Sequence, residues 1–551
     1  MCYLYAQFKR TRMIERIFRH KLLLYSLLTG LLLALSWPAR GFPFLVFFAF
    51  VPLFWVEDRL LARRGENRAV VFLLYAWVAF FVFNLLTTWW IMFATVPGMI
   101  AAVVLNATFM AIPWWLMHLS RRILPSAQGP LPVIIFWMAF EFLHARWELS
   151  WSWLDLGNVF AAYPAWVQWY SATGTAGGTL WVLTVNILLF FFIRQFVLES
   201  FVGKRARWNA IMALLVFAIP SVISFYTWIT YEEDARPVSI VIVQPAEDPY
   251  EQMRSRAELE QHINNMIALA DSRISPATRF VIAPEGANPH GIWKHEAEQH
   301  YTIRTLRAHI DENPGIAWIM GSFTYEMFDP RDGLPATARQ HPLTGDYFNA
   351  YNSAFMVEAG RPVQFYHKSK LVPGIERMPY FTVLGPLGRL VDRFGGIAGS
   401  LGTQDTRDVF ISAEQRRVAP AVCYESIYGD FMAGYILNGA SLIFIITNDG
   451  WWRDTPGYRQ HLQYARLRAI ETRRSVARSA STGISAFINQ RGEIIKETNW
   501  WEPAAISATL NENNHITFYA RTGNFLGKIS LFVSVLFLFF MISQRIIKRR
   551  I

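Results

Sequence analysis

The sequence predicts a protein of two parts, a multi-span α-helical membrane domain and an α/β domain outside the membrane. Of its 551 residues, 53% are hydrophobic. The apolar residues form runs long enough to cross a bilayer, because about 20 helical residues span its roughly 30 Å hydrocarbon core. One long polar stretch instead alternates short β-branched runs with helical ones. We therefore expect a seven-span membrane domain over 1–228, the α/β domain over 229–527, and a last membrane helix with a basic tail over 528–551.

Eight apolar runs predict eight membrane helices, at 22–38, 42–57, 69–92, 95–118, 130–146, 176–198, 208–228 and 528–545. The second run is short enough to be a tilted or re-entrant segment. The first is interpreted as an anchor, because no small-residue cleavage site precedes a polar start. The connection 147–175 is rich in Trp and Tyr, which favour the membrane–water interface, so we expect it to lie along the outer headgroups.

The net charge of +11 could suggest a nucleic-acid partner, but the placement of the cations indicates membrane orientation instead. Lys and Arg gather in alternate connections, within 9–21, 59–68, 121–122, 194–207 and 545–550. The short connections on the other side carry only Arg40 and Arg146. Because cationic side chains resist translocation, both termini are expected in the cytoplasm and 229–527 outside. We expect no nucleic-acid partner.

The polar stretch has the pattern of a mixed α/β domain. Strands are predicted at 238–243, 279–283, 316–321, 351–357, 417–422, 442–446, 475–480 and 484–489. Helices are predicted at 251–272, 295–311 and 457–474, the last introduced by a Pro-Gly pair. Periodicity leaves two architectures open, a two-layered α/β domain and a four-layer sandwich.

Three chemically different side chains stand at the ends of predicted strands. Glu285 follows the strand at 279–283, Lys368 follows the strand-like run VQFYH, and Cys423 follows the strand at 417–422. Such ends face the crevice in which open α/β sheets bind ligands. A thiol attacks as its thiolate, which an ammonium stabilises, and a carboxylate in an apolar crevice can exchange its proton. The three could therefore form a nucleophile, base and cation; alternatively, Glu285 and Lys368 are a structural ion pair beside an inert Cys423.

The cysteines and histidines bear on whether the protein has a disulfide, a reactive thiol or a metal site. The predicted topology puts Cys2 and Cys423 on opposite sides of the membrane, so they cannot pair. A lone thiol in an oxidising exterior is a liability unless its chemistry is used, although a buried inert cysteine is the alternative. His295 and His300 are five residues apart, which turns them about 140° from each other on a helix and argues against a zinc pair. We expect no metal and no cofactor.

Six short motifs in a fixed order resemble one family. They are WLDLG at 153–157, Pro284-Glu285, YHKSKLVP at 366–373 followed by Glu376, Cys423-Tyr424-Glu425, NDGWW at 448–452, and QHLQYARLRA at 460–469. Together they resemble the apolipoprotein N-acyltransferases, nitrilase-superfamily enzymes of the bacterial inner membrane. Three positions depart from the commoner pattern: the residues after Glu285, the sequence PGIER at 373–377, and Ala246, which puts an asparagine contact there in doubt.

The resemblance implies an αββα sandwich in the periplasm and a ping-pong acyl transfer. A phospholipid would acylate Cys423 as a thioester, and the α-amine of a diacylglyceryl-modified apolipoprotein would then accept the chain. Glu285 would be the base and Lys368 the cation, supported by Glu376. The substrate-binding residues implied are Tyr424, Glu425 and Trp451. Two rival readings are a membrane-tethered amidase that hydrolyses a C–N bond with the same triad, and an inactive lipid-binding scaffold.

The segment 377–401 is apolar for an exterior loop and is bracketed by glycines. Two interpretations stay open. It could be a short buried helix that completes the core, or a mobile lid that dips into the headgroups and guides acyl chains to Cys423.

Overall fold

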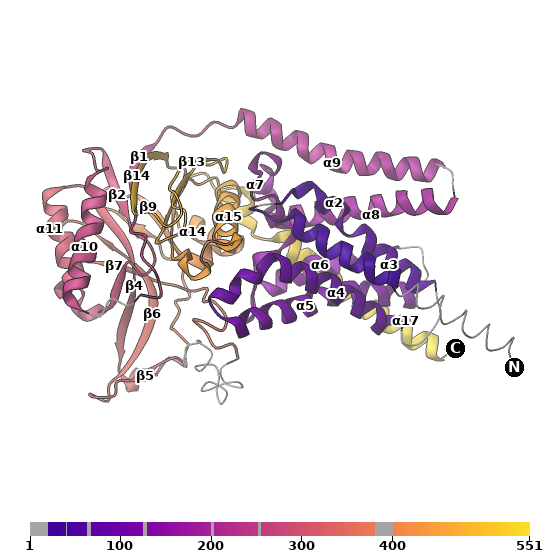
Figure 1. Ribbon diagram of the computed structural model, residues 1–551, viewed down its shortest axis with the longest axis horizontal. Helices are drawn as coiled ribbons and strands as arrows, with labels where there is room; N and C mark the ends of the chain where they lie inside the picture. Colours follow the sequence, from indigo (N-terminus) through magenta and orange to yellow (C-terminus); the bar gives the residue numbers. More distant parts are fainter. Residues whose placement is uncertain are drawn as a thin grey trace.

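The computed structural model describes residues 20–39, 41–62, 68–124, 129–199, 203–251, 255–380 and 400–550. A bundle of helices forms one end of the molecule and two β-sheets with their own helices form the other (Figure 1). Most of the segment 377–401 lies outside the described residues, so its two interpretations are left open.

Each of the eight apolar runs is mainly helical where it is described. They form the helix His20–Ser36, the series η1 (Pro43–Leu45), α2 (Val46–Ala49) and α3 (Val51–Leu61), then α4 (Arg68–Thr88) with η2 (Trp89–Phe93), α5 (Val96–Ile123), α6 (Pro132–His144), α8 (Thr175–Glu199), α9 (Lys204–Thr230) and α17 (Phe525–Arg550). Among the described residues, five helices are long and apolar enough to cross a membrane: Ala69–Phe93, Val96–Ile123, Thr175–Val197, Lys204–Thr230 and Phe525–Lys548. The protein is therefore a membrane protein.

The short second run is broken rather than continuous. η1 and α3 each carry a proline in their first turn. Proline has no backbone N–H to donate and is tolerated where a helix begins, so it favours successive short helices here. Together with the short helices His20–Ser36 and Pro132–His144, this run packs against the longer spans.

The other end is a sandwich of two mixed sheets. The first has the order β14-β1-β2-β4-β6-β5, with β3 paired to β4 and β7 to β6; the second has the order β13-β12-β11-β10-β9-β8. The strands of the first are β1 (Pro237–Gln244), β2 (Thr278–Ile282), β3 (Asn288–Trp293), β4 (Ala317–Phe328), β5 (Arg339–Gln340), β6 (Tyr347–Val357), β7 (Gln364–His367) and β14 (Ala504–Asn511). Those of the second are β8 (Phe410–Ile411), β9 (Arg417–Val422), β10 (Leu442–Thr447), β11 (Val476–Ala480), β12 (Ala486–Ile488) and β13 (Ile494–Glu497).

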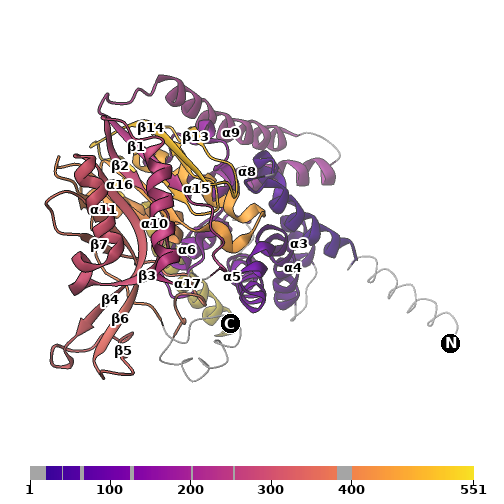
Figure 2. The same ribbon diagram turned by 60° about the vertical axis from the view of Figure 1, so that its left-hand side comes forward.

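Both faces of the first sheet are buried, which decides between the two architectures left open by the sequence. On β1, Ile240 and Ile242 join the core shared with the second sheet, whereas Val241 and Val243 join a separate core with α10 (Arg256–Asp271) and α11 (Tyr301–Glu312). This is the two-residue alternation of a strand. Figure 2 shows α10 and α11 over the outer face. With α14 (Gly429–Leu437) and α15 (Pro456–Thr472) on the second sheet, the layers are α–β–β–α, so the predicted sandwich is confirmed.

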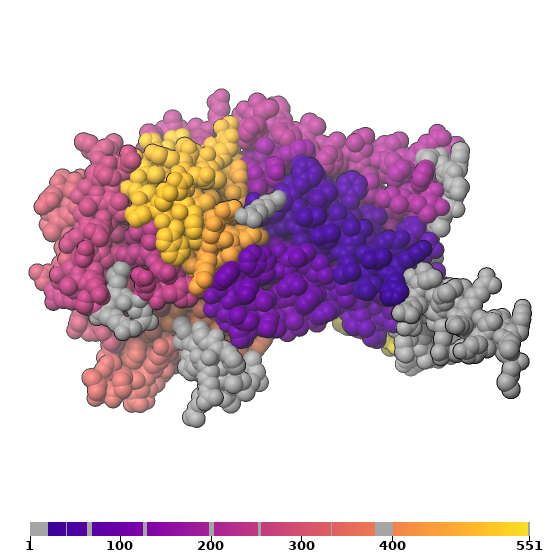
Figure 3. Space-filling view, in the orientation of Figure 1, coloured from indigo at the N-terminus to yellow at the C-terminus, as the bar shows by residue number. Residues whose placement is uncertain are grey.

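Part of the connection 147–175 is buried in the protein rather than exposed to the headgroups as expected. Trp153 and Tyr170 are buried, and the Trp153 indole donates a hydrogen bond of 2.7 Å to Gln460 on α15. The indole N–H finds its polar partner in the sandwich domain rather than in interfacial water. The prediction was wrong for these residues because the sandwich covers the loop. In the space-filling view the orange surface of that domain lies directly against the violet surface of the membrane helices (Figure 3).

Candidate active site

Lys368 stands at the centre of a buried ion cluster. It follows the last residue of β7, and its backbone N–H donates to Asn352 O at 2.8 Å, which continues the pairing with β6. Its Nζ lies 3.1 Å from Glu285 Oε1 and 2.9 Å from Glu376 Oε1. Although burial alone would lower it, the two carboxylates hold the pKa of Lys368 well above its usual range. Lys368 is therefore a fixed cation.

The two carboxylates are held in place by groups besides the lysine. The Asn352 side-chain amide donates to both, at 2.8 Å to Glu285 Oε1 and 2.7 Å to Glu376 Oε1. The backbone N–H of Asn448 donates to Glu285 Oε2 at 3.1 Å, and that of Val372 donates to Glu376 Oε2 at 2.8 Å. Every oxygen of the pair thus has a donor. Asn352 was not predicted, since nothing in the β6 sequence marks it.

Cys423 directly follows β9, which ends at Val422, and begins the short helix η10 (Cys423–Ile427). Its φ of +49° is left-handed, a conformation that non-glycine residues rarely adopt and that points to a constrained site. Burial raises the pKa of the Cys423 thiol well above its usual value, and the charge of Glu285 raises it further. Lys368 and a hydrogen bond with Thr447 oppose this. The resting thiol is therefore protonated, and attack requires a base to remove the proton.

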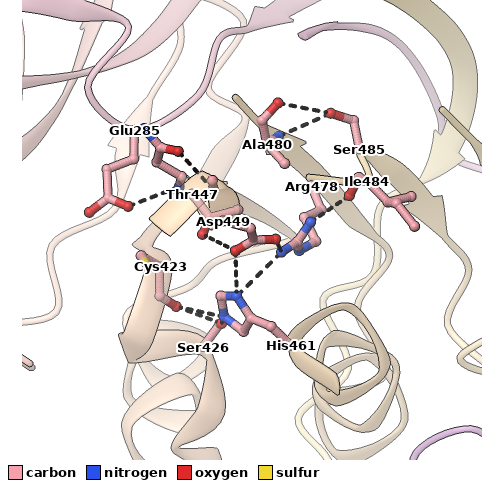
Figure 4. A network of polar contacts seen from close by, with 12 residues as sticks. Glu285, Cys423, Ser426, Thr447, Asp449, His461, Arg478, Ala480, Ile484 and Ser485 are labelled. Atoms are coloured by element: carbon pink, nitrogen blue, oxygen red, sulfur yellow. Dashed lines mark hydrogen bonds and ion pairs between the residues drawn. The ribbon is translucent and has the colours of Figure 1, made fainter. Parts of the chain in front are cut away.

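A second polar network lies behind the cysteine (Figure 4). Asp449 Oδ1 accepts from the Thr447 hydroxyl and from His461 Nδ1, both at 3.0 Å, and Asp449 Oδ2 pairs with Arg478. Although burial raises the pKa of Asp449, Arg478 and His461 hold it well below its usual range. On its other side, His461 Nε2 lies 3.3 Å from the Cys423 carbonyl oxygen. In the sequence this histidine is part of the motif at 460–469 but has no evident partner, because Asp449 lies on a different element.

Cys423 faces a cavity of about 360 Å³ between the membrane helices and the sandwich. One wall comes from η2 and α5, and the opposite wall from the residues after Lys368 and from η10. Its lining is mostly apolar and aromatic, and includes Trp90, Trp151, Trp153, Tyr424, Trp452 and His461. An apolar pocket with few polar groups is the usual form of a small-ligand site. Here the pocket borders a membrane helix.

The structure places the three expected substrate-binding residues differently. Tyr424 lines the cavity, and its hydroxyl donates to Ser150 O at 2.8 Å. Trp451 does not line it: this side chain is 41% exposed and packs on Tyr250, with ring centroids 5.3 Å apart, while Trp452 faces the cavity. Consecutive residues of the helical turn η11 (Asp449–Trp452) point in different directions, so a motif containing both tryptophans does not say which faces inward.

Glu425 also lies outside the cavity lining, fully buried behind it. Its Oε1 accepts from the Tyr366 hydroxyl at 2.8 Å and the Ser369 N–H at 2.6 Å, and its Oε2 accepts from the Val422 N–H at 2.9 Å. Burial raises the pKa of Glu425 to about 7, against these hydrogen bonds. One carboxyl thus joins the residue after Lys368 to the residue before Cys423, which fixes the spacing of the two segments rather than the shape of the pocket.

Comparison with known proteins gives matches for both parts of the chain. The family model of the apolipoprotein N-acyltransferase N-terminal domain matches residues 29–188, and that of carbon-nitrogen hydrolases matches residues 242–515. The apolipoprotein N-acyltransferase of Chlorobaculum tepidum is 29% identical over 90% of this chain and 91% of its own length. Those of Thermotoga maritima and Geobacter metallireducens are 23% and 25% identical, over 96% and 91% of this chain and 95% and 91% of theirs. With both domains present in this order, the chain belongs to the apolipoprotein N-acyltransferase family.

Proposed function

We propose that the protein moves an acyl chain from a membrane phospholipid, through a thioester on Cys423, to the α-amine of the diacylglyceryl-cysteine that begins an apolipoprotein. The relatives are named apolipoprotein N-acyltransferases, which supports the N-acylation of lipoproteins. The two-step route through Cys423 goes further than those names. One observation carries it: Cys423 lies on the wall of an apolar cavity whose opposite wall is the membrane helix α5. A lipid acyl chain is the kind of substrate that such a cavity fits.

In the first half-reaction, Glu285 takes the thiol proton of Cys423 and the thiolate attacks the ester carbonyl of the phospholipid. Lys368 faces the oxyanion that forms, a contribution of about 3–4 kcal/mol for a well-placed donor. The tetrahedral intermediate collapses, the C–O bond breaks, and the lysophospholipid alkoxide leaves with the proton from Glu285. The buried, protonated thiol described above requires such a base.

In the second half-reaction, the amine of the apolipoprotein attacks the thioester. Its proton passes to Glu285, the C–S bond breaks, and the returning thiolate of Cys423 takes that proton. Dividing one difficult transfer into two easier ones is the general advantage of covalent catalysis. Glu376 supports Lys368 here through the 2.9 Å contact and has no separate chemical step.

The orientation belongs to the same proposal. With both termini in the cytoplasm, the sandwich lies in the periplasm of a bacterial inner membrane, with 1–228 and 528–551 forming the membrane part. The helices α9 and α17 lead into and out of the sandwich, which keeps the site at the bilayer surface where both lipid-anchored substrates arrive.

The test is to incubate the purified protein in bilayers of phospholipid with a labelled acyl chain and to determine the mass of the Cys423 peptide. The proposal expects one acyl group on Cys423, discharged on adding a diacylglyceryl lipopeptide. Cys423→Ser should block both steps, because a serine hydroxyl is a far weaker nucleophile. Cys2→Ser is the matched control, since it removes the other cysteine and should transfer normally. Steady release of free acid would instead indicate a hydrolase, and no labelling at all a lipid-binding scaffold.

A further inference from the structure

Cys423 holds a left-handed backbone that its own residue type disfavours, so other contacts must maintain it. Its carbonyl oxygen accepts from the Ser426 hydroxyl at 2.7 Å and lies within hydrogen-bond distance, 3.3 Å, of His461 Nε2. His461 Nε2 and Ser426 Oγ are themselves 3.0 Å apart. The three groups form a closed triangle around the carbonyl of the cysteine.

Other buried side chains hold the imidazole ring of His461 in place. Asp449 Oδ1 lies 3.0 Å from His461 Nδ1, and a carboxylate in this position orients the imidazole ring. Arg478 pairs with the second oxygen of the same carboxylate, and its Nη2 lies 3.3 Å from His461 Nδ1. All three side chains are almost fully buried. The rings of Trp153 and Trp452, with centroids 5.7 Å and 5.8 Å from that of His461, close the remaining sides.

Thr447 connects this network to the cysteine side chain. Its hydroxyl donates to Asp449 Oδ1, and a hydrogen bond with Thr447 lowers the pKa of the Cys423 thiol against the effect of burial. The next residue donates its backbone N–H to Glu285. The last residue of β10 and the two residues after it therefore link Cys423, Glu285 and His461 (Figure 4).

We infer that His461, held by Asp449 and Arg478, is a positioning residue: it keeps Cys423 in the backbone conformation that directs the thiol toward Glu285 and Lys368. This inference rests on the proposed function only in taking Cys423 as the nucleophile. It assigns His461 no contact with the reacting atoms. Without the histidine contact, the Cys423 carbonyl keeps one of its two side-chain anchors, and the residue relaxes toward an ordinary strand conformation.

Two substitutions distinguish the contact made by His461 Nε2 from the contact made by His461 Nδ1. In His461→Gln the side-chain amide lies about where Nε2 lies and can still donate to the Cys423 carbonyl. In His461→Asn the shorter side chain reaches only the place of Nδ1, so it keeps Asp449 and loses Cys423. The readout is the rate at which iodoacetamide alkylates Cys423 in a Cys2→Ser background, followed by mass and measured together with acyl loading from phospholipid. His309→Asn is the matched control, because His309 is also buried and bonded to an aspartate, Asp271, at 2.8 Å, on a helix away from the site.

The inference expects His461→Asn to alkylate and to load about ten- to a hundred-fold more slowly, the range that a misplacement of about 1 Å can cause. His461→Gln should recover most of that loss, and His309→Asn should match the parent. Equal rates in the Gln and Asn variants would overturn the inference, as would a normal rate in the Asn variant. If both variants fail to fold, Ser426→Ala takes their place, since it removes the other anchor: slower alkylation supports the inference and an unchanged rate overturns it. Alkylation needs no lipid, so it separates this result from a failure of the acyltransferase proposal.

Discussion

Replacing Lys368 with Met removes the cation of the proposed triad while keeping most of the side-chain length. In the folded protein Lys368 is 1% exposed and lies within 3.1 Å of Glu285 and 2.9 Å of Glu376. The substitution leaves two carboxylates that face each other through the single amide of Asn352. Breaking a buried pair in this way costs about 3–5 kcal/mol, because an uncompensated charge stays behind.

The effect on the reaction has two sources in the structure. The positive charge of Lys368 lowers the pKa of the Cys423 thiol against burial, so its loss makes the thiolate harder to form. The oxyanion also loses its cation, which by itself corresponds to about 10²–10³ in rate. We therefore expect acyl loading of Cys423 to fall by at least about 10³-fold when both effects are present.

The assay is the initial rate of acyl-Cys423 formation, measured by mass and normalised to the fraction of folded protein from a melting curve. Lys370→Met is the matched control. That ammonium donates to the Ala145 carbonyl at 3.0 Å, outside the carboxylate cluster, so its loss should cost about 1 kcal/mol of stability and leave loading intact. If Lys368→Met loads normally and Lys370→Met does not, the lysine has been assigned two residues out of register and the reasoning fails.

Three further predictions concern the surroundings of the triad. Ala102→Trp places an indole in the cavity beside Cys423, so loading from long-chain phospholipid should fall while alkylation by iodoacetamide continues; equal losses of both would contradict the cavity as the acyl site. Asp449→Ala leaves Arg478 buried without its carboxylate and should lower the free energy of unfolding by about 3–5 kcal/mol, seen as a lower melting temperature; a melting temperature equal to that of the parent would contradict it. Burial raises the pKa of Glu425 from an ordinary value of about 4.3 to about 7, so between these pH values the folded protein binds a proton that the unfolded chain does not. The stabilisation that this proton gives is complete below about pH 4 and is lost as the pH rises through 7. From pH 5 to pH 8 the parent should therefore lose up to about 3 kcal/mol of stability relative to Glu425→Gln, measured by melting at each pH; a difference that does not change with pH would refute it.

The sequence singled out the three candidate catalytic residues because each follows an apolar run that ends abruptly. Glu285, Lys368 and Cys423 needed only the position of the strand before them, and all three strands are present. Asn352 gives no such signal. It lies inside β6, and its contacts with Glu285 and Glu376 arise from how β6 pairs with β4 and β7. Pairing of this kind is a tertiary property that a local pattern does not contain.

The unpredicted elements have a similar cause. β14 is not a conspicuous strand by composition, and it is stabilised by antiparallel pairing with β1 from the other end of the domain. β3 contains a proline and a glycine, which disfavour strands, yet it pairs along β4 with a register shift. From the sequence alone Trp153 is interpreted as a residue of the membrane interface, because its hydrogen-bond partner Gln460 is distant in the sequence. In each case distant residues override the local preference.

The helix α15 has a mechanical consequence for the enzyme. Gln460 donates to the Thr87 carbonyl at 3.3 Å, and the Tyr464 hydroxyl bonds with both Trp37 and the Trp153 carbonyl, so one face of α15 is fastened to the bundle. The residue next to Gln460 is His461, whose Nε2 lies 3.3 Å from the Cys423 carbonyl oxygen. Membranes of different thickness tilt or compress helices, and a tilt of the bundle would be passed to the cysteine through one rigid turn of α15. We expect turnover to depend on the chain length of the surrounding lipids, even those that the enzyme does not consume.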